Sequence, residues 1–177
     1  IMGSPYSSMS EYVQHVSDVI SASGLKVIVK PHPLDSVPPL PEDVFVADKE
    51  DNISDLIAAA DVVFTINSSA GFEAALAGKP VYVLGAAPYS GLGLTIDVPD
   101  PADLTFIWQT HRTNCACSPA LRASILDFAE TQYFLSAIQF CEPSVHLARL
   151  ADTGEQGSQR NHFEYRNQAC SVGVSKN

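Results

Sequence analysis

The stretch Val62-Val-Phe-Thr-Ile-Asn-Ser-Ser-Ala-Gly-Phe-Glu-Ala-Ala-Leu-Ala-Gly-Lys-Pro-Val-Tyr-Val-Leu84 decides the fold. Its first five residues are all β-branched or aromatic, and an unbroken run of this kind is typical of a strand buried in a parallel sheet. A helix is expected from about residue 70 to 77, because Gly78 is a common helix terminator. Residues 81–84 form a second apolar run. The stretch therefore predicts a strand, a helix and a second strand in succession.

The residues before Val62 extend this alternation. Ser8 and Glu11 form a capping-box pattern at the start of a helix that Gly24 is expected to end. Further elements are expected at residues 25–29 (strand), 44–46 (strand) and 53–60 (helix, capped by Asp51 or Asn52). Right-handed crossovers between such elements build a Rossmann-like α/β fold with a doubly wound parallel sheet.

Beyond Gly85 the pattern weakens. Residues 86–95 form a loop rich in glycine and proline, and broad apolar periodicity predicts one long helix or a helical pair over residues 121–140. From Thr153 onward the chain is rich in Gly, Ser, Gln and Asn. We therefore expect a Rossmann-like domain over residues 1–150 and an irregular, disordered or peripheral C-terminal tail over residues 151–177.

Composition excludes several classes of function. The 177 residues carry 20 Asp plus Glu against 10 Lys plus Arg, a formal net charge of −10, so nucleic acid is not an expected partner. No apolar run reaches the ~18 to 20 residues of a membrane helix, and the start lacks a signal-peptide pattern, so a cytoplasmic protein is expected. The four cysteines form no CxxC pair, so no metal site is expected.

The expected ligand site lies outside the carboxyl ends of the strands, as in other open α/β sheets. Loops of unusual composition follow three strands there, at residues 30–33, 67–71 and 85–95. The turn from Asn67 to Gly71 offers free backbone N–H groups, the positive end of a helix dipole and the hydroxyls of Ser68 and Ser69. It is either an anion cradle or a simple helix cap, and the two interpretations are compatible.

Charged residues near this edge also have two interpretations each. His32 lies between two prolines that restrict its direction, and Lys30 precedes it, so both suit a phosphate ligand; the alternative is a proline-rich turn with an incidental histidine. Glu73 lies one helical turn after Ser69 and can accept hydrogen bonds from a ribose diol. Its alternative role is a favourable acid near a helix N-terminus.

Three segments together resemble the capsule polysaccharide biosynthesis and export family. They are Val29-Lys-Pro-His-Pro-Leu-Asp35, the stretch from Ala60 to Val81, and Leu84-Gly-Ala-Ala-Pro-Tyr-Ser-Gly-Leu-Gly-Leu-Thr95. Better-understood members of that family are Kdo transferases of GT-B fold, and the resemblance covers roughly residues 1–135. It implies that the chain is one half of a GT-B fold, the half that binds the nucleotide sugar.

The resemblance also implies roles for individual residues. His32 of the HP motif, as the catalytic residue, and Ser68 and Ser69 of the SS motif would contact the phosphate of a CMP-sugar, and Glu73 would contact its ribose. Lys30, Asn67, Gly71, Tyr89 and Thr95 complete the expected substrate-binding set, in which Tyr89 and Thr95, like Gly91 and Gly93, match the family's loop without separate roles. No cofactor or metal is implied, since no DxD-type motif is present.

The resemblance places the acidic general base of GT-B enzymes in an N-terminal half that these residues do not include. The implied partners are that half, a CMP-sugar donor and a glycolipid or oligosaccharide acceptor, with peripheral association at the inner face of the bacterial inner membrane. Transfer of Kdo from CMP-Kdo is the first hypothesis. A UDP-sugar 2-epimerase and a nonenzymatic nucleotide-binding or assembly module are the alternatives.

Overall fold

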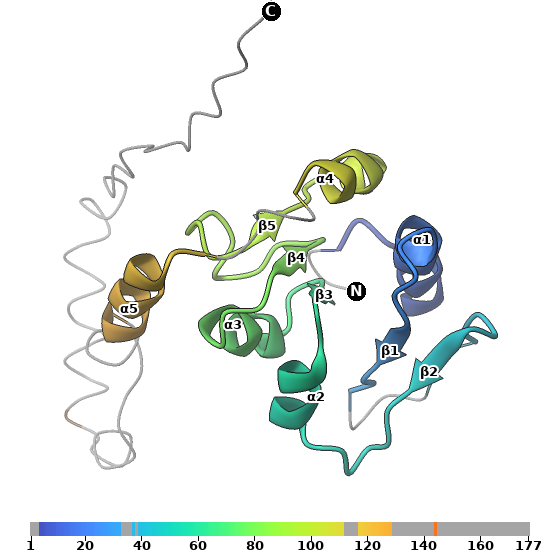
Figure 1. The fold of residues 1–177 in the computed structure, drawn as a ribbon, viewed down its shortest axis with the longest axis horizontal. Helices are drawn as coiled ribbons and strands as arrows, with labels where there is room; N and C mark the ends of the chain where they lie inside the picture. Colours follow the sequence, from blue (N-terminus) through green and yellow to red (C-terminus); the bar gives the residue numbers. More distant parts are fainter. Residues whose placement is uncertain (1–3, 33–36, 38, 112–116, 129–143, 145–177) are drawn as a thin grey trace, which may run out of the picture. The chain divides into compact units, whose positions relative to one another are not determined.

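A computed structural model describes residues 4–32, 37, 39–111, 117–128 and 144 (Figure 1). The chain divides into two compact units, Ile1–Phe128 and Ala129–Asn177. Ser144 is the one described residue of the second unit, and the helices and strands whose bounds are described all lie in the first. The expected tail and most of the helix predicted over residues 121–140 lie outside the described residues.

Helices and strands alternate along the first unit. Their bounds are α1 Met9–Ser21, β1 Val27–Val29, β2 Val44–Val46, α2 Ile53–Ala59, β3 Val63–Thr65, α3 Ser69–Leu76, β4 Val81–Val83, β5 Ile96–Asp97, the 3-10 helix η1 Pro101–Asp103, α4 Leu104–His111 and α5 Pro119–Phe128. The expected helices and strands before Gly85 are all present, with ends that differ by a few residues at most. A Rossmann-like α/β fold is confirmed.

The described strands pair in parallel within two sheets. One contains β1 and β2, and the other has the order β3-β4-β5. The sequence predicted a single sheet. Side chains rather than a hydrogen-bond ladder connect β1 to β3, because Val27, Val29 and Phe64 pack against one hydrophobic cluster. The parallel direction that positions the loops is as expected.

Strand β4 is covered on both faces. Successive side chains of a strand point to opposite faces. Accordingly, Tyr82, together with Leu84 just after the strand, packs with α1 and α4, whereas Val81 and Val83 pack with α2, α3 and the loop after β4. All four are at most 1% exposed. Helices on both faces of a buried parallel strand are the signature of the doubly wound arrangement that the sequence predicted.

Local signals fix the ends of the helices. The side chains of Ser8, Asn52 and Ser68 cap α1, α2 and α3 by accepting a hydrogen bond from a backbone N–H in the first turn. Gly78 follows the C-cap of α3 with a φ of +83°, in the left-handed region that glycine adopts without steric cost. These signals are short in sequence, so they were predictable.

Three elements after Gly85, β5, η1 and α4, were not predicted. Strand β5 has two residues, too few for a period to show. Helix α4 follows η1, where Asp100 accepts a hydrogen bond from the Ala102 N–H and a proline occupies the first helical turn. Those two residues are recognised helix-start signals, so α4 was accessible from the sequence.

Candidate functional site

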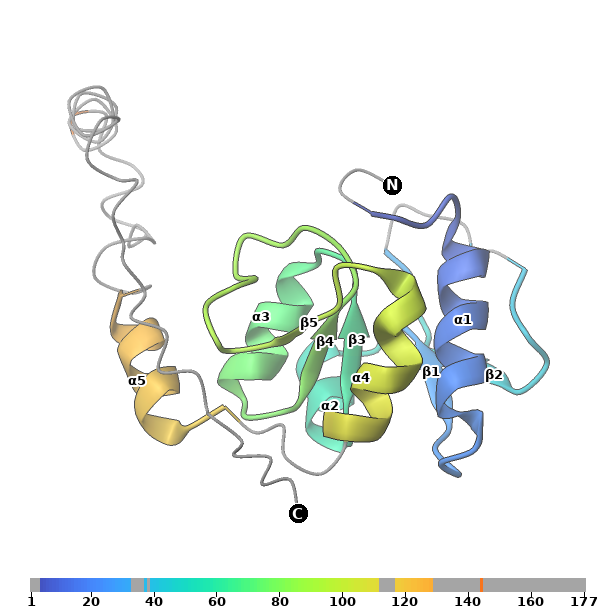
Figure 2. The same ribbon diagram turned by 90° about the horizontal axis from the view of Figure 1, so that it is seen from above.

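The loops that follow the strands gather at one edge of the first unit. Val29 pairs with Val46 and Thr65 pairs with Val83, so the strands of each sheet end level with one another. Figure 2 shows β1 pointing toward the edge at which α3 begins and around which the loop after β4 runs. The carboxyl ends of the strands therefore meet at this edge, which is the expected place of the ligand site.

The turn between β3 and α3 is held from within. Ser68 donates its N–H to Oγ1 of the buried Thr65 (3.2 Å), and its own hydroxyl oxygen accepts the N–H of Ala70 (3.2 Å). The Gly71 N–H donates to the carbonyl of Ser68 (3.0 Å). The capping interpretation of Ser68 is thus confirmed. The side chains of Asn67 and Ser69 are exposed at the same edge.

Tyr89 reaches this turn from the loop after β4. Its hydroxyl donates to the Ser68 carbonyl (2.5 Å), and its ring lies against that of Phe72 with centroids 5.7 Å apart. Gly71 makes the approach possible, because a Cβ there would collide with the Tyr89 hydroxyl and lie 2.6 Å from Cγ2 of Thr65. Tyr89 and Gly71 are both buried, so in this structure they support the turn rather than face solvent.

Burial also keeps Tyr89 in its donor form. Desolvation raises the pKa of the phenol, a hydrogen bond with Thr65 opposes the rise, and the Asp97 carboxylate adds to it. A phenol whose pKa lies above its ordinary value of 10.0 is neutral at physiological pH. The hydrogen bond from Tyr89 to Ser68 therefore persists across the physiological range.

Asp97 organises the rest of the loop after β4. Its carboxylate accepts the hydroxyl of Thr95 (2.7 Å) and the backbone N–H of Gly91 (2.6 Å). The hydroxyl of Thr95, a residue that was expected to bind substrate, thus donates its hydrogen bond to Asp97. Asp97 was not predicted as a site residue. Its one signal in the sequence is its position two residues after a threonine, at the end of a glycine-rich loop.

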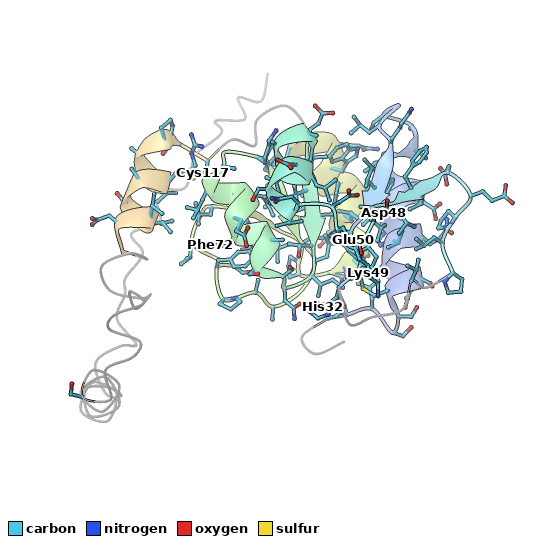
Figure 3. The ribbon with its side chains drawn as sticks, turned by 90° about the horizontal axis from the view of Figure 1, so that it is seen from below. His32, Asp48, Lys49, Glu50, Phe72 and Cys117 are labelled. Atoms are coloured by element: carbon cyan, nitrogen blue, oxygen red, sulfur yellow. The ribbon has the colours of Figure 1, made fainter. Side chains whose placement is uncertain are left out.

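Lys30 and His32 follow β1 and differ in their surroundings. The Lys30 ammonium donates to the backbone carbonyls of Asp48 and of Lys49 (2.9 Å for the latter), so it fastens the loop after β2. His32 is exposed, and Figure 3 shows it at the same edge as the loop that contains Asp48, Lys49 and Glu50. Pro33, the second of the two prolines that flank His32, lies outside the described residues.

Glu73 is exposed on α3, one turn after Ser69. Within the described part of the chain, no group of three His, Cys, Asp or Glu side chains is arranged to hold a metal ion. Over the same residues, no helix combines the length and apolar character needed to cross a membrane. The polar groups that the structure brings to this edge include hydroxyls, amides, the imidazole of His32 and the carboxylates of Glu73 and Asp97.

Comparison with known proteins adds the family. The model of the capsule polysaccharide biosynthesis protein family matches residues 40–134, more than half of the 177 residues. The chain belongs to this family. A search of the curated proteins found no match.

The family match covers the segment from β2 to α5. It includes the Ser68 turn, Glu73, Tyr89 and Asp97, and the residues that hold the turn are thus within it. Helix α1, strand β1 and His32 precede the matched residues. Membership of the capsule biosynthesis family establishes a role in making capsule polysaccharide, whereas the roles of single residues are matters for proposal.

Proposed function

We propose that this chain is the donor-binding half of a glycosyltransferase of capsule polysaccharide biosynthesis, and that its donor is CMP-Kdo. The Ser68 turn carries the proposal. A turn that opens a helix at the carboxyl edge of parallel strands, with hydroxyls and amide groups converging, suits the phosphate of a nucleotide sugar. A GT-B architecture and an N-terminal half that completes it belong to this proposal.

The proposed reaction is an inverting displacement. The acceptor hydroxyl attacks the anomeric carbon of the sugar, the bond from that carbon to the phosphate oxygen breaks, and CMP leaves with the electron pair. Donors fixed around the phosphate stabilise the charge that develops on it. His32 and Ser69 donate to this phosphate, and Glu73 accepts hydrogen bonds from the ribose. The base that takes the acceptor's proton belongs to the proposed N-terminal half.

Calorimetric titration of the chain with CMP, UMP and inorganic phosphate tests the proposal. We expect CMP to bind more tightly than UMP, and both to bind more tightly than phosphate. Equal affinity for CMP and UMP would remove the CMP-sugar assignment and leave a general nucleotide site. Such a site would be compatible with the epimerase alternative, which requires binding of UDP-sugars. Binding of none of the three would remove the donor-binding function itself.

An activity assay separates transfer from binding. The chain alone is expected to bind CMP and to transfer no sugar, because the base is supplied by the other half. Transfer of Kdo to an oligosaccharide or glycolipid acceptor should appear when an N-terminal half from the family is added. CMP binding without transfer under both conditions would favour a nonenzymatic nucleotide-binding module.

A further inference from the structure

The amide groups at the start of α3 are not equivalent. The N–H groups of Ser68, Ala70 and Gly71 are directed to Oγ1 of Thr65, Oγ of Ser68 and the Ser68 carbonyl, respectively. These contacts, among the described residues, account for three of the four amides that a helix N-terminus leaves without a partner in the helix. The fourth is the N–H of Ser69, and the Ser69 side chain is exposed.

The direction of the Ser69 N–H follows from the carbonyl that precedes it. A trans peptide is planar, and its C=O and N–H point in opposite directions. The described residues contain no cis peptide. The Ser68 carbonyl accepts the Tyr89 hydroxyl on the inner side and the Gly71 N–H as well. With that carbonyl held inward, the Ser69 N–H faces away from the core, toward the edge where the loops meet.

We infer that Tyr89 is a positioning residue of the donor site, which aims the Ser69 N–H at the donor phosphate by holding the Ser68 carbonyl. This inference rests on the proposed function. It changes the role of Tyr89 from a residue that contacts the ligand to one that acts through Ser68. Gly71 is part of the same arrangement, because any larger residue at this position would displace the Tyr89 hydroxyl from the Ser68 carbonyl.

The test compares CMP affinity in three variants. Tyr89→Phe keeps the ring against Phe72 and removes the hydroxyl alone, and we expect CMP to bind about three- to tenfold more weakly, the worth of one aligned hydrogen bond. Gly71→Ala should weaken binding at least as much. The double variant should bind no more weakly than Gly71→Ala alone, because both changes release one carbonyl. Additive losses would overturn the inference.

Ser90→Ala is the matched control. The Ser90 hydroxyl lies in the same loop and is buried, and it has no hydrogen-bond partner among the described residues. Its removal should leave the CMP affinity unchanged. A purely structural role for Tyr89 would lower the midpoint of unfolding in Tyr89→Phe and leave the CMP dissociation constant as in the wild type, and that result would also overturn the inference.

Amide NMR of the ligand-free protein separates this inference from the proposed function. If Tyr89 holds the turn, Tyr89→Phe shifts the amide resonances of residues 68–71 before any ligand is added, whereas Ser90→Ala does not. Unchanged resonances would overturn the inference even in a protein that binds CMP. Failure of the wild type to bind CMP would overturn the proposed function, and the resonances would still decide whether Tyr89 orders the turn.

Discussion

The guanidinium of Arg122, on α5, covers Gly78, the glycine that follows α3. A Cβ at Gly78 would collide with Nη1 of Arg122, and the φ of +83° is unfavourable for any residue with a side chain. Arg122 therefore occupies the space that a side chain at residue 78 would need.

Gly78→Ala should destabilise the fold by more than backbone strain alone. Strain in the left-handed region costs roughly 1 to 2 kcal/mol. Gly24→Ala is the matched control, because Gly24 has a φ of +70° and nothing lies within 4 Å of its added Cβ. Urea denaturation should give a larger loss for Gly78→Ala, and the difference measures displacement of Arg122. Equal losses would show that Arg122 yields without cost.

Tyr12→Phe should stabilise the protein by up to about 1 kcal/mol, because it removes a buried hydroxyl that has no hydrogen-bond partner among the described residues. Burial raises the pKa of this phenol, so it is neutral in the folded state. Thermal unfolding measures the change. Tyr6→Phe is the contrast, since the Tyr6 hydroxyl bonds to Nδ1 of His15 (2.8 Å), and its loss should lower the midpoint. A lower midpoint for Tyr12→Phe would contradict the prediction.

Acid should weaken the start of α1 through Glu11. The hydroxyl and the backbone N–H of Ser7 donate to this carboxylate and hold its pKa below the ordinary value of 4.5. A lowered pKa means that the stabilisation is complete above about pH 4.5 and is lost as the pH falls through the lower folded value. In Glu11→Gln, stability measured by denaturation should fall less steeply below that pH. A wild-type slope in the variant would exclude Glu11 as the source.

Lys30→Met should lower the stability of the fold, whereas His32→Ala should lower the affinity for CMP. Since the Lys30 ammonium binds two backbone carbonyls, its loss should lower the midpoint of unfolding and leave CMP affinity nearly unchanged. His32 is exposed, so His32→Ala should preserve the fold and weaken CMP binding about tenfold or more, the worth of a charge-assisted hydrogen bond. Calorimetry and thermal unfolding of both variants check this pair. Weaker CMP binding in Lys30→Met would instead indicate that Lys30 takes part in binding the phosphate.

The predictable parts of the fold are those with local signals. Ser68 as a cap, Gly78 as a terminator and the apolar runs of the strands act over a few residues, and each appears where the sequence placed it. The contact between Tyr89 and Ser68 joins residues 21 positions apart, and a single sequence carries no sign of it. Tyr89 could be selected as a site residue, but its direction toward a carbonyl could not be foreseen.

The same limit explains Gly71 and the division into two sheets. Gly71 was expected to face a ligand, as glycines of anion-binding turns do, and its crowding by Thr65 and Tyr89 exists only in the folded chain. The strand lengths predicted from apolar runs exceed those observed, since Val62 and Ile66 are apolar and pack in the core but lie outside the three residues of β3. The pattern of apolar residues in a sequence indicates which segments are buried. Burial alone does not determine which strands share hydrogen bonds.

Strand β4 has a consequence for how the first unit unfolds. Val81 and Val83 belong to one core cluster, and Tyr82, with Leu84 just after the strand, belongs to the other, so neither cluster can dissolve without loosening the other. A cavity made at Val83 and one made at Tyr82 should therefore lower a single shared melting transition rather than divide it into two steps. The loops at the carboxyl edge would then be lost together, and a partly melted form that retained the Ser68 turn would not accumulate.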